Sequence, residues 1–266
     1  MSHVEVLVLH GALVMSSEPY YKDDLNTLYL GDAVEVMRTL EDESFDLVIT
    51  SPPYNLKNST GNGFVSAGSS AWNKAFTEDG LGHGYDKHTD KLEHEDYVEW
   101  QRECLSEMLR LIKPNGAIFY NHKWRVQGGL LQDRADIMSG FPVRQIIIWQ
   151  RAGGMIFNPH FFTPTYEVIY MVAKPDFRLA DKACRIGDVW KITQERNTPH
   201  PAPFPYKLPQ TIISSSTAQR VLDPFVGSGT TMRAAMDLGI ESVGIDNSEK
   251  YCEMTVERLA QQVLAV

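Results

Sequence analysis

The sequence predicts an α/β fold with a mostly parallel sheet and helices on both faces. Short apolar runs alternate with longer segments whose apolar residues recur at helical spacing, which is typical of strand–helix–strand units. The 266 residues are 43% hydrophobic and 22% charged, which are ordinary values for a globular domain. A chain of this length can bury a substantial core without disulfides or metals.

The first elements are predicted by apolar runs and by the breakers that end them. Phe45–Thr50 is a buried strand that stops at a Pro-Pro pair, and Asp96–Ile112 has helical spacing and stops at the Pro-Asn-Gly turn over 114–116. Further strands are expected at 117–120, 146–149 and 168–172.

The last part of the chain repeats the alternation. A strand over 220–225 enters a glycine turn, a helix follows over 230–238, and a strand over 242–245 precedes a closing helix over 248–263. We therefore expect one domain over residues 25–266.

Two stretches do not fit this core. Residues 58–94 are rich in Gly, Ser, Asn and charged residues without periodicity, which predicts a long mobile loop or lid. Residues 174–207 contain six basic residues up to Arg196 and four prolines from Pro199 to Pro205. This second stretch is expected to be a small recognition and linker segment.

Cysteine usage and hydropathy limit where the protein works. Cys104, Cys184 and Cys252 are too widely spaced for a disulfide framework, and no CxxC pair suggests a metal, so we expect no metal and a reducing cytoplasm. The apolar stretch over 4–15 is interrupted by Glu5 and His10 and has no basic leader. It predicts neither a signal peptide nor a membrane span.

Charge is distributed unevenly. The net charge of -9 argues against a nucleic-acid partner, but residues 101–200 contain 14 Lys and Arg against 9 Asp and Glu. Positive charge is therefore concentrated where a phosphate-contacting face would have to be built.

The glycine turn predicts a nucleoside-type cofactor. Two glycines allow close backbone approach to a ligand, the following helix offers free N–H groups, and an acid ends the next strand, where it can accept both hydroxyls of a ribose. A nucleoside triphosphate is disfavoured because the P-loop lysine is missing. The predicted contacts are Asp223, Pro224, Phe225, Gly227, Ser228, Gly229, Thr230 and Asp246.

The second motif, Ser51-Pro52-Pro53-Tyr54, directly follows a strand. Its two prolines fix the backbone, which leaves the Ser51 hydroxyl and the Pro52 carbonyl as neighbouring acceptors with an aromatic ring close by. This arrangement suits an amino group on a flat ring, although the prolines alone are also compatible with a simple strand-ending turn.

Together the two motifs resemble those of the DNA amino-methyltransferases, which transfer a methyl group from S-adenosylmethionine to adenine N6 or cytosine N4. The motif order, with Ser51–Tyr54 before the glycine turn, resembles the beta class, a permuted version of the Rossmann-like methyltransferase fold. The resemblance implies a flipped base in double-stranded DNA. It also suggests a cognate restriction endonuclease and a homodimer as further partners.

Other roles follow from the same resemblance. Asp32 would contact the cofactor adenine, although by itself it is also a good helix N-cap. His200 and Phe204 would pack around the methionine part. Glu167 would support the base pocket, or be a partly buried acid with a local partner. The residues expected to contact DNA are Asn55, Arg178, Lys182 and Arg185.

Two other methyltransferase classes fit the sequence less well. Cytosine C5 methylation needs a cysteine nucleophile, usually after a proline, and none of the three cysteines follows a proline. Protein-glutamine methyltransferases have the reverse motif order. A catalytically silent nucleic-acid or nucleotide-binding module and an adenine N6 enzyme stay open. Ser51 favours cytosine N4, because serine usually begins the motif in cytosine N4 enzymes of the family.

Overall fold

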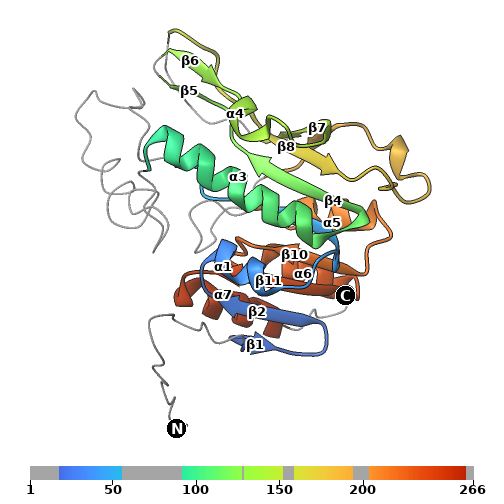
Figure 1. Cartoon of the computed structure of the whole chain (residues 1–266). Helices are drawn as coiled ribbons and strands as arrows, with labels where there is room; N and C mark the ends of the chain where they lie inside the picture. The colour runs from blue at the N-terminus through green and yellow to red at the C-terminus, as the bar shows by residue number, and fades with distance from the viewer. Residues whose placement is uncertain (1–17, 56–91, 128, 152–158, 194–203, 262–266) are drawn as a thin grey trace.

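The computed structural model describes residues 18–55, 92–127, 129–151, 159–193 and 204–261. Nine of the described strands form one mixed sheet in the order β1-β2-β11-β10-β3-β4-β8-β7-β9 (Figure 1). Their bounds are β1 Tyr21–Lys22, β2 Asn26–Leu30, β3 Phe45–Thr50, β4 Ile112–His122, β7 Val143–Gln150, β8 Tyr166–Ala173, β9 Val189–Lys191, β10 Arg220–Asp223 and β11 Glu241–Asp246. A separate hairpin, β5 Arg125–Gln127 and β6 Leu130–Gln132, extends from the end of β4.

The sheet is mostly parallel, as predicted. Strands β2, β11, β10, β3 and β4 all run in one direction, and β9 runs parallel to β7. Strand β8 is antiparallel to β4 and β7, and β1 is antiparallel to β2. The antiparallel part therefore lies beyond the central parallel strands.

Helices cover both faces of the sheet. Helices α1 (Ala33–Thr39) and α3 (His94–Leu111) pack on one face, while α5 (Lys207–Ser214), α6 (Thr230–Asp237) and α7 (Glu249–Ala260) pack on the other. Two short helical turns, α4 (Ala135–Met138) and η3 (Ala183–Arg185), complete the described elements.

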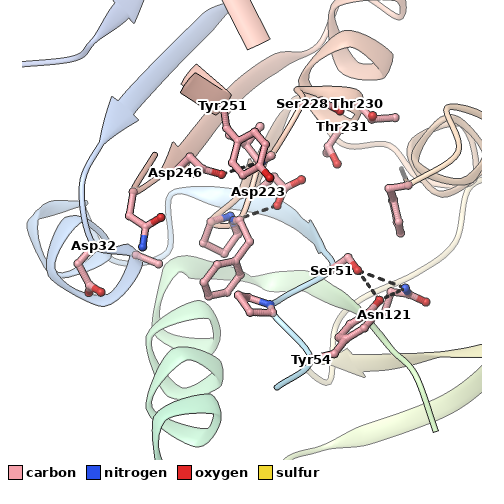
Figure 2. Close-up of a pocket in the computed structure, with 18 of the residues that line it drawn as sticks. Asp32, Ser51, Tyr54, Asn121, Asp223, Ser228, Thr230, Thr231, Asp246 and Tyr251 are labelled. Atoms are coloured by element: carbon pink, nitrogen blue, oxygen red, sulfur yellow. Dashed lines mark hydrogen bonds between the residues drawn. The ribbon is translucent and has the colours of Figure 1, made fainter. Parts of the chain in front are cut away.

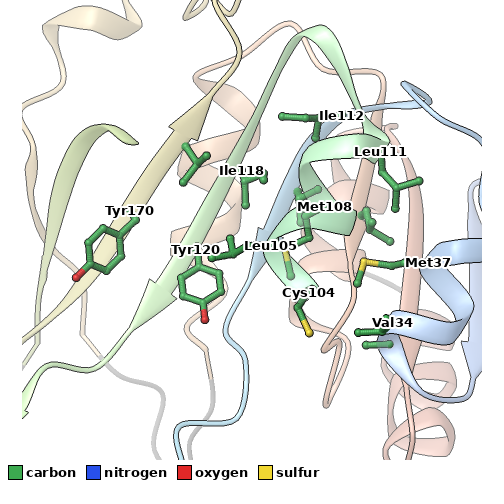
Figure 3. Close-up of a cluster of buried hydrophobic side chains, with 14 of the residues drawn as sticks. Val34, Met37, Cys104, Leu105, Met108, Leu111, Ile112, Ile118, Tyr120 and Tyr170 are labelled. Carbon is green, nitrogen blue, oxygen red and sulfur yellow. The ribbon is translucent and has the colours of Figure 1, made fainter. Parts of the chain in front are cut away.

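Strand residues alternate between these two cores because successive side chains point to opposite faces. Val48 of β3 packs with the α1 and α3 core, whereas Leu47 and Ile49 pack with the α5 and α6 core. Figure 3 shows the first of these cores, where Met37 of α1 and Met108 of α3 meet Ile118 of β4.

Helix α3 begins two residues before its predicted start, at His94, so the loop expected over 58–94 ends earlier than predicted. Its buried residues follow helical spacing. The predicted turn over 114–116 is instead a bulge inside β4, where the pairing shifts between Phe45 and Leu47. A side chain at Gly116 would place its Cβ 2.8 Å from the Ile112 Cβ, so this bulge needs glycine.

Some elements were not predicted from the sequence. The strands β1, β5, β6 and β9 and the helix α4 are too short to show a period. The strand β2 and the helix α5 were also missed. Strand β9 lies inside the predicted linker over 174–207, so part of that linker is an edge strand of the sheet. Most of the loop predicted over 58–94, and the end of the closing helix predicted to reach Val263, lie outside the described residues. No described helix is long and apolar enough to span a membrane.

The topology creates a crevice between β3 and β10. These neighbouring strands are parallel, but the chain continues from β3 to β4 on one side and from β10 to β11 on the other. Helix α3, before β4, and helix α6, before β11, lie on opposite faces of the sheet. Such a switch point at the carboxyl ends of strands is where α/β sheets bind ligands.

Candidate active site

A pocket opens at this switch point, and both predicted motifs contribute to its wall. Figure 2 shows Ser51, Tyr54 and Asn121 at one end, Asp246 and Tyr251 at the other, and Asp223 between them. The lining residues from the glycine turn are Asp223, Pro224, Phe225, Val226, Gly227, Ser228, Thr230 and Thr231. The structure thus brings together two segments about 170 residues apart in the sequence.

A buried hydrogen bond joins the two motifs. The Thr50 hydroxyl, just before Ser51, donates to the Asp223 carboxylate (Oγ1 to Oδ1, 2.8 Å), which also accepts from the Phe225 amide at 3.1 Å. Burial raises the pKa of Asp223 to about 6, and these hydrogen bonds oppose the rise. Asp223 therefore anchors the turn to the strand that ends at Ser51.

Asp246 organises the glycine turn from the end of β11. Its Oδ2 accepts from the Gly227 amide and its Oδ1 from the Ser248 amide, both at 2.9 Å. Burial, followed by the negative charge of Asp223, raises the pKa of Asp246 to about 6, while the amide hydrogen bonds lower it. The Asn247 amide also stabilises the carboxylate, and because the two carboxylate oxygens have four lone pairs, Asp246 can still accept a further hydrogen bond.

The two glycines of the turn have different roles. Gly227 lines the pocket with φ 52°, as expected for close backbone approach. Gly229 is not among the lining residues; it is the N-cap of α6 with φ 78°, and a Cβ there would lie 2.9 Å from Cγ2 of Thr255 on α7. Gly229 therefore allows α6 to pack on α7, and its contact with a cofactor stays a prediction.

The other predicted cofactor residues are placed unevenly. Asp32 lines the pocket and also caps α1, since its Oδ1 accepts from the amides of Val34 (2.9 Å) and Glu35 (3.1 Å). Phe204 lines the pocket beside Trp149, with ring centroids 6.3 Å apart. His200 lies outside the described residues.

The Ser51–Tyr54 motif forms a compact hydrogen-bonded turn. The Ser51 and Tyr54 hydroxyl oxygens are 2.5 Å apart, and the Asn121 side-chain amide donates to the Tyr54 hydroxyl at 2.7 Å (Figure 2). The Tyr54 ring is buried and tilted against His122, with centroids 4.8 Å apart. Tyr54 thus lines the pocket while its hydroxyl is held by neighbouring side chains.

The two proline carbonyls of the motif differ. The Pro53 carbonyl accepts from the Tyr97 hydroxyl at 2.9 Å and the Gln101 amide at 3.2 Å, so the protein already uses it. The Pro52 carbonyl accepts no hydrogen bond from the described part of the chain, which agrees with its predicted role as an acceptor for a ligand, although Pro52 is not among the lining residues. Helix α3 therefore fixes the motif through the Pro53 carbonyl.

A neutral histidine supports this turn. Burial, followed by the positive charge of Arg134, lowers the pKa of His122 to about 3. Its Nε2 lies 2.8 Å from the Tyr97 hydroxyl oxygen, and its Nδ1 lies 3.1 Å from the Lys123 carbonyl oxygen.

Glu167 lies in the pocket and also has the local partner that its sequence allowed. It is 7% exposed, its Oε1 lies 3.6 Å from Nε of Arg151, and its Oε2 accepts from the Asn121 amide at 3.0 Å. Its position on β8 brings a carboxylate beside the Ser51–Tyr54 motif.

The predicted DNA contacts are not at the pocket. Arg178 lines a small cleft with Asp46, at the start of β3, whereas Ser51 follows its end. Lys182 and Arg185 lie on the connection from the end of β8 to the edge strand β9, which runs beyond the tip of the β8 arrow in Figure 1. Because β8 runs antiparallel to the central strands, this connection leaves the sheet at the end opposite to the carboxyl ends of β3 and β10, where the pocket lies. The location therefore argues against contact with DNA that reaches the pocket.

Asn55 is also not available as a surface contact. It is 2% exposed, and its side-chain amide donates to the Leu92 carbonyl at 2.7 Å. It has a positive φ of 55°, which asparagine tolerates better than most residues. The Asn55 side chain therefore holds the backbone at Leu92, just before the start of α3.

Several lining residues were missed by sequence reasoning. Trp100, Asn121 and Trp149 lie far in the sequence from both motifs and no local pattern marks them, although Asn121 comes directly after the strand predicted at 117–120, where ligand-facing side chains are expected. Others, such as Thr231 and Asn247, are direct neighbours of predicted contacts. The missed residues are Gly31, Ala33, Trp100, Asn121, Trp149, Val226, Thr231, Asn247 and Tyr251. Among the described residues, no group of three or more His, Cys, Asp or Glu is placed to hold a metal ion.

A family model described as DNA methylase, of the N6/N4 methyltransferase type, matches residues 45–257, which span both motifs. The chain belongs to this DNA methylase family. The match includes β3 with Ser51–Tyr54 and β11 with Asp246, both of which contribute residues to the pocket.

Individual proteins agree with this assignment. The methylase is 25% identical to the type II methyltransferase M.BglII of Bacillus subtilis, over 90% of this chain and 70% of that protein. It is 26% identical to M2.LlaDCHI of Lactococcus lactis subsp. cremoris, over 92% and 93%. The fold is similar to the PvuII cytosine-N4-specific DNA methyltransferase (TM-score 0.69, 18% identity, 94% and 92% covered) and to the M1.HpyAVI–SAM complex (TM-score 0.56, 21% identity, 88% and 100% covered).

Proposed function

We propose that the methylase is a site-specific enzyme that methylates N4 of cytosine in double-stranded DNA, with S-adenosylmethionine as the methyl donor. The observation on which this proposal rests is the serine at position 51, whose hydroxyl lines the end of the pocket beside Tyr54. Two named relatives support it: M.BglII is a type II methyltransferase, and the PvuII enzyme is specific for cytosine N4.

The charges of the pocket fit this cofactor. Asp223 and Asp246 are close enough for the charge of one to raise the pKa of the other, and a cationic sulfonium compound would offset that repulsion. Asp246 keeps an acceptor position for a hydroxyl of a ribose, and Asp32 lies near the same end (Figure 2). Phe204 would pack against the methionine part. When bound, S-adenosylmethionine supplies a methyl group whose bond to sulfur breaks, with the electron pair left on sulfur, as a bond to the amine nitrogen forms.

Two acceptors of this chain prepare the amine. The lone pair of an exocyclic amine is delocalised into the ring, so the nitrogen is a poor nucleophile. The Ser51 hydroxyl and the Pro52 carbonyl would each accept one N–H, which favours a pyramidal nitrogen and directs its lone pair out of the ring plane. Well-oriented reacting groups can contribute on the order of 7–11 kcal/mol.

The base must leave the duplex to reach these groups. A stacked and paired base cannot enter a pocket that is enclosed by Tyr54, Trp149 and Phe225, so the target nucleotide is flipped out. A cognate restriction endonuclease is a further partner that the type II relatives suggest.

Methylation-aware sequencing of DNA from cells that express the chain and contain no other methylase tests this function. We expect N4-methylcytosine within one recurring sequence, and none with Ser51→Ala, which removes one acceptor. Adenine modification at a recurring site would transfer the proposal to N6. Unmodified DNA, together with no S-adenosylmethionine binding in calorimetry, would instead support a silent binding module.

A further inference from the structure

The pocket contains a carboxylate that has no part in the proposed binding of the amine by Ser51 and Pro52. Glu167 is buried, lines the pocket on β8, and has its Oε2 3.4 Å from the Tyr54 hydroxyl oxygen. The Tyr54 hydroxyl is in turn 2.5 Å from the Ser51 hydroxyl. A continuous row of oxygen atoms therefore leads from the position of the amine to a buried carboxylate.

The donors and acceptors in this row have a defined direction. An ionised carboxylate can only accept, so Tyr54 donates its single hydroxyl hydrogen to Glu167. Ser51 must then donate its own hydrogen to Tyr54, and its lone pairs are left to accept from an amine. The hydrogens thus point away from the amine, which is the direction in which a proton would have to move.

We propose that Glu167 is the final acceptor of the amine proton, which reaches it through the hydroxyls of Ser51 and Tyr54. This inference rests on the proposed amine methylation and extends it, because Ser51 alone is too weak a base to keep the proton. Glu167 acts through Tyr54 and Ser51, so it is a positioning residue for the proton pathway.

The proton balance of the step is simple. One N–H bond of the methylated, positively charged amine breaks and its proton binds Ser51 Oγ, while the Ser51 proton passes to Tyr54 and the Tyr54 proton to Glu167 Oε2. The amine nitrogen keeps the electron pair of the broken bond and becomes neutral. Ser51 and Tyr54 end as hydroxyls, Glu167 ends as a neutral carboxylic acid, and solvent later removes this proton.

Two neighbours hold the carboxylate in place. The Asn121 amide donates both to Glu167 Oε2 at 3.0 Å and to the Tyr54 hydroxyl at 2.7 Å, which fixes the two oxygens relative to each other. The Arg151 guanidinium lies 3.6 Å from the opposite oxygen, Oε1. The 3.4 Å distance between the Tyr54 hydroxyl and Glu167 Oε2 is longer than an ordinary hydroxyl hydrogen bond, so the pathway requires it to shorten when the base fills the pocket, as catalytic hydrogen bonds commonly do.

The test compares Glu167→Gln, which keeps the size of the side chain but cannot accept a proton, with Tyr54→Phe, which removes the linking hydroxyl. We expect the single-turnover rate at pH 8 to fall by about 100-fold or more in Glu167→Gln. The dependence of the rate on pH should differ between the unaltered enzyme and Glu167→Gln, because the substituted side chain cannot take up a proton. In the double variant the rate should be no lower than in the slower single variant, because both substitutions break one pathway.

Binding readouts separate a proton pathway from a structural role. Cofactor affinity by calorimetry and base flipping, reported by 2-aminopurine fluorescence at the target position, should stay within about twofold of the unaltered enzyme. Glu241→Gln is the matched control, because Glu241 is an exposed carboxylate at the start of β11. It should keep the full rate and the pH dependence.

Two outcomes would overturn the pathway: an unchanged rate with an unchanged pH dependence in Glu167→Gln, or a loss of base binding as large as the loss of rate. If Glu167→Gln does not fold, a full rate in Tyr54→Phe would overturn it as well. Failure of the proposed function would look different, since the methylated nucleoside made by the unaltered enzyme identifies the base independently of these rates.

Discussion

Asp246 accepts hydrogen bonds from two backbone amides and also lines the pocket. Its position there could be predicted from the sequence, because the acid ends an apolar strand that comes after the glycine turn. Ser51 could also be predicted from the sequence, since it lies between a strand and a Pro-Pro pair. Asn121 was not, because its role depends on β4 pairing with β3 in parallel, a contact between distant segments.

The titration of Asp246 predicts how cofactor affinity depends on pH. A carboxyl group with a pKa of about 6 becomes protonated between pH 7 and pH 5 and then no longer attracts a cationic ligand. We expect the affinity for S-adenosylmethionine to fall as the pH is lowered through this range, by up to about tenfold at one unit below the pKa.

Calorimetric titrations at pH 7 and pH 5 measure this effect. Asp246→Asn should bind more weakly at pH 7 and show a shallower pH dependence. Asp42→Asn, at a carboxylate with a 71% exposed side chain that pairs with Arg110, should behave like the unaltered chain. Equal affinities at the two pH values would rule out a role for the ionised acid.

At the scale of elements, the long periodic segments were predicted and the short ones were not. Helix α3 was placed to within two residues because its apolar face repeats over five turns. Strand β9, with three residues, has no period to detect, and its pairing with β7 decides its conformation. The bulge over 114–116 was predicted as a turn because a Pro-Asn-Gly sequence is compatible with either a turn or a bulge.

The packing of α6 on α7 gives a prediction with an internal control. Gly229 and Gly239 both have positive φ, at 78° and 69°, but a Cβ at Gly229 meets Thr255 at 2.9 Å whereas a Cβ at Gly239 meets nothing within 4 Å. Alanine at either position adds backbone strain of about 1–2 kcal/mol. Only Gly229→Ala adds an overlap, which costs about 1–3 kcal/mol more.

Urea unfolding of the two variants measures the difference in the free energy of unfolding. We expect Gly229→Ala to be clearly the less stable variant and also to bind S-adenosylmethionine more weakly, since α6 follows the cofactor turn directly. Equal losses of stability would show that α7 moves aside at no cost.

At the scale of the whole molecule, the direction of β8 decides which surface can meet DNA. Basic residues concentrate in the middle third of the sequence, yet three of them, Arg178, Lys182 and Arg185, lie on the connection that follows the end of β8. Sequence alone could not place this connection. An antiparallel strand ends at the opposite end of the sheet from its parallel neighbours, and the direction of β8 is not evident from its sequence.

Neutralising these three residues tests that placement. The combined change of Arg178, Lys182 and Arg185 to Gln should leave the slope of DNA affinity against salt concentration unchanged, because the slope counts only released phosphate counterions. Circular dichroism would confirm that the variant is folded. A slope lowered by nearly one unit per residue would place this connection on the DNA after all.

The proposed reaction of this pocket is methylation of the exocyclic amine of cytosine. The most direct measurement is mass spectrometry of nucleosides from DNA that the purified protein has methylated with isotopically labelled S-adenosylmethionine. We predict labelled N4-methylcytosine, and none with Ser51→Ala. Labelled N6-methyladenine in its place would contradict the choice of base, and labelled C5-methylcytosine or an unlabelled DNA would contradict the whole account of the site.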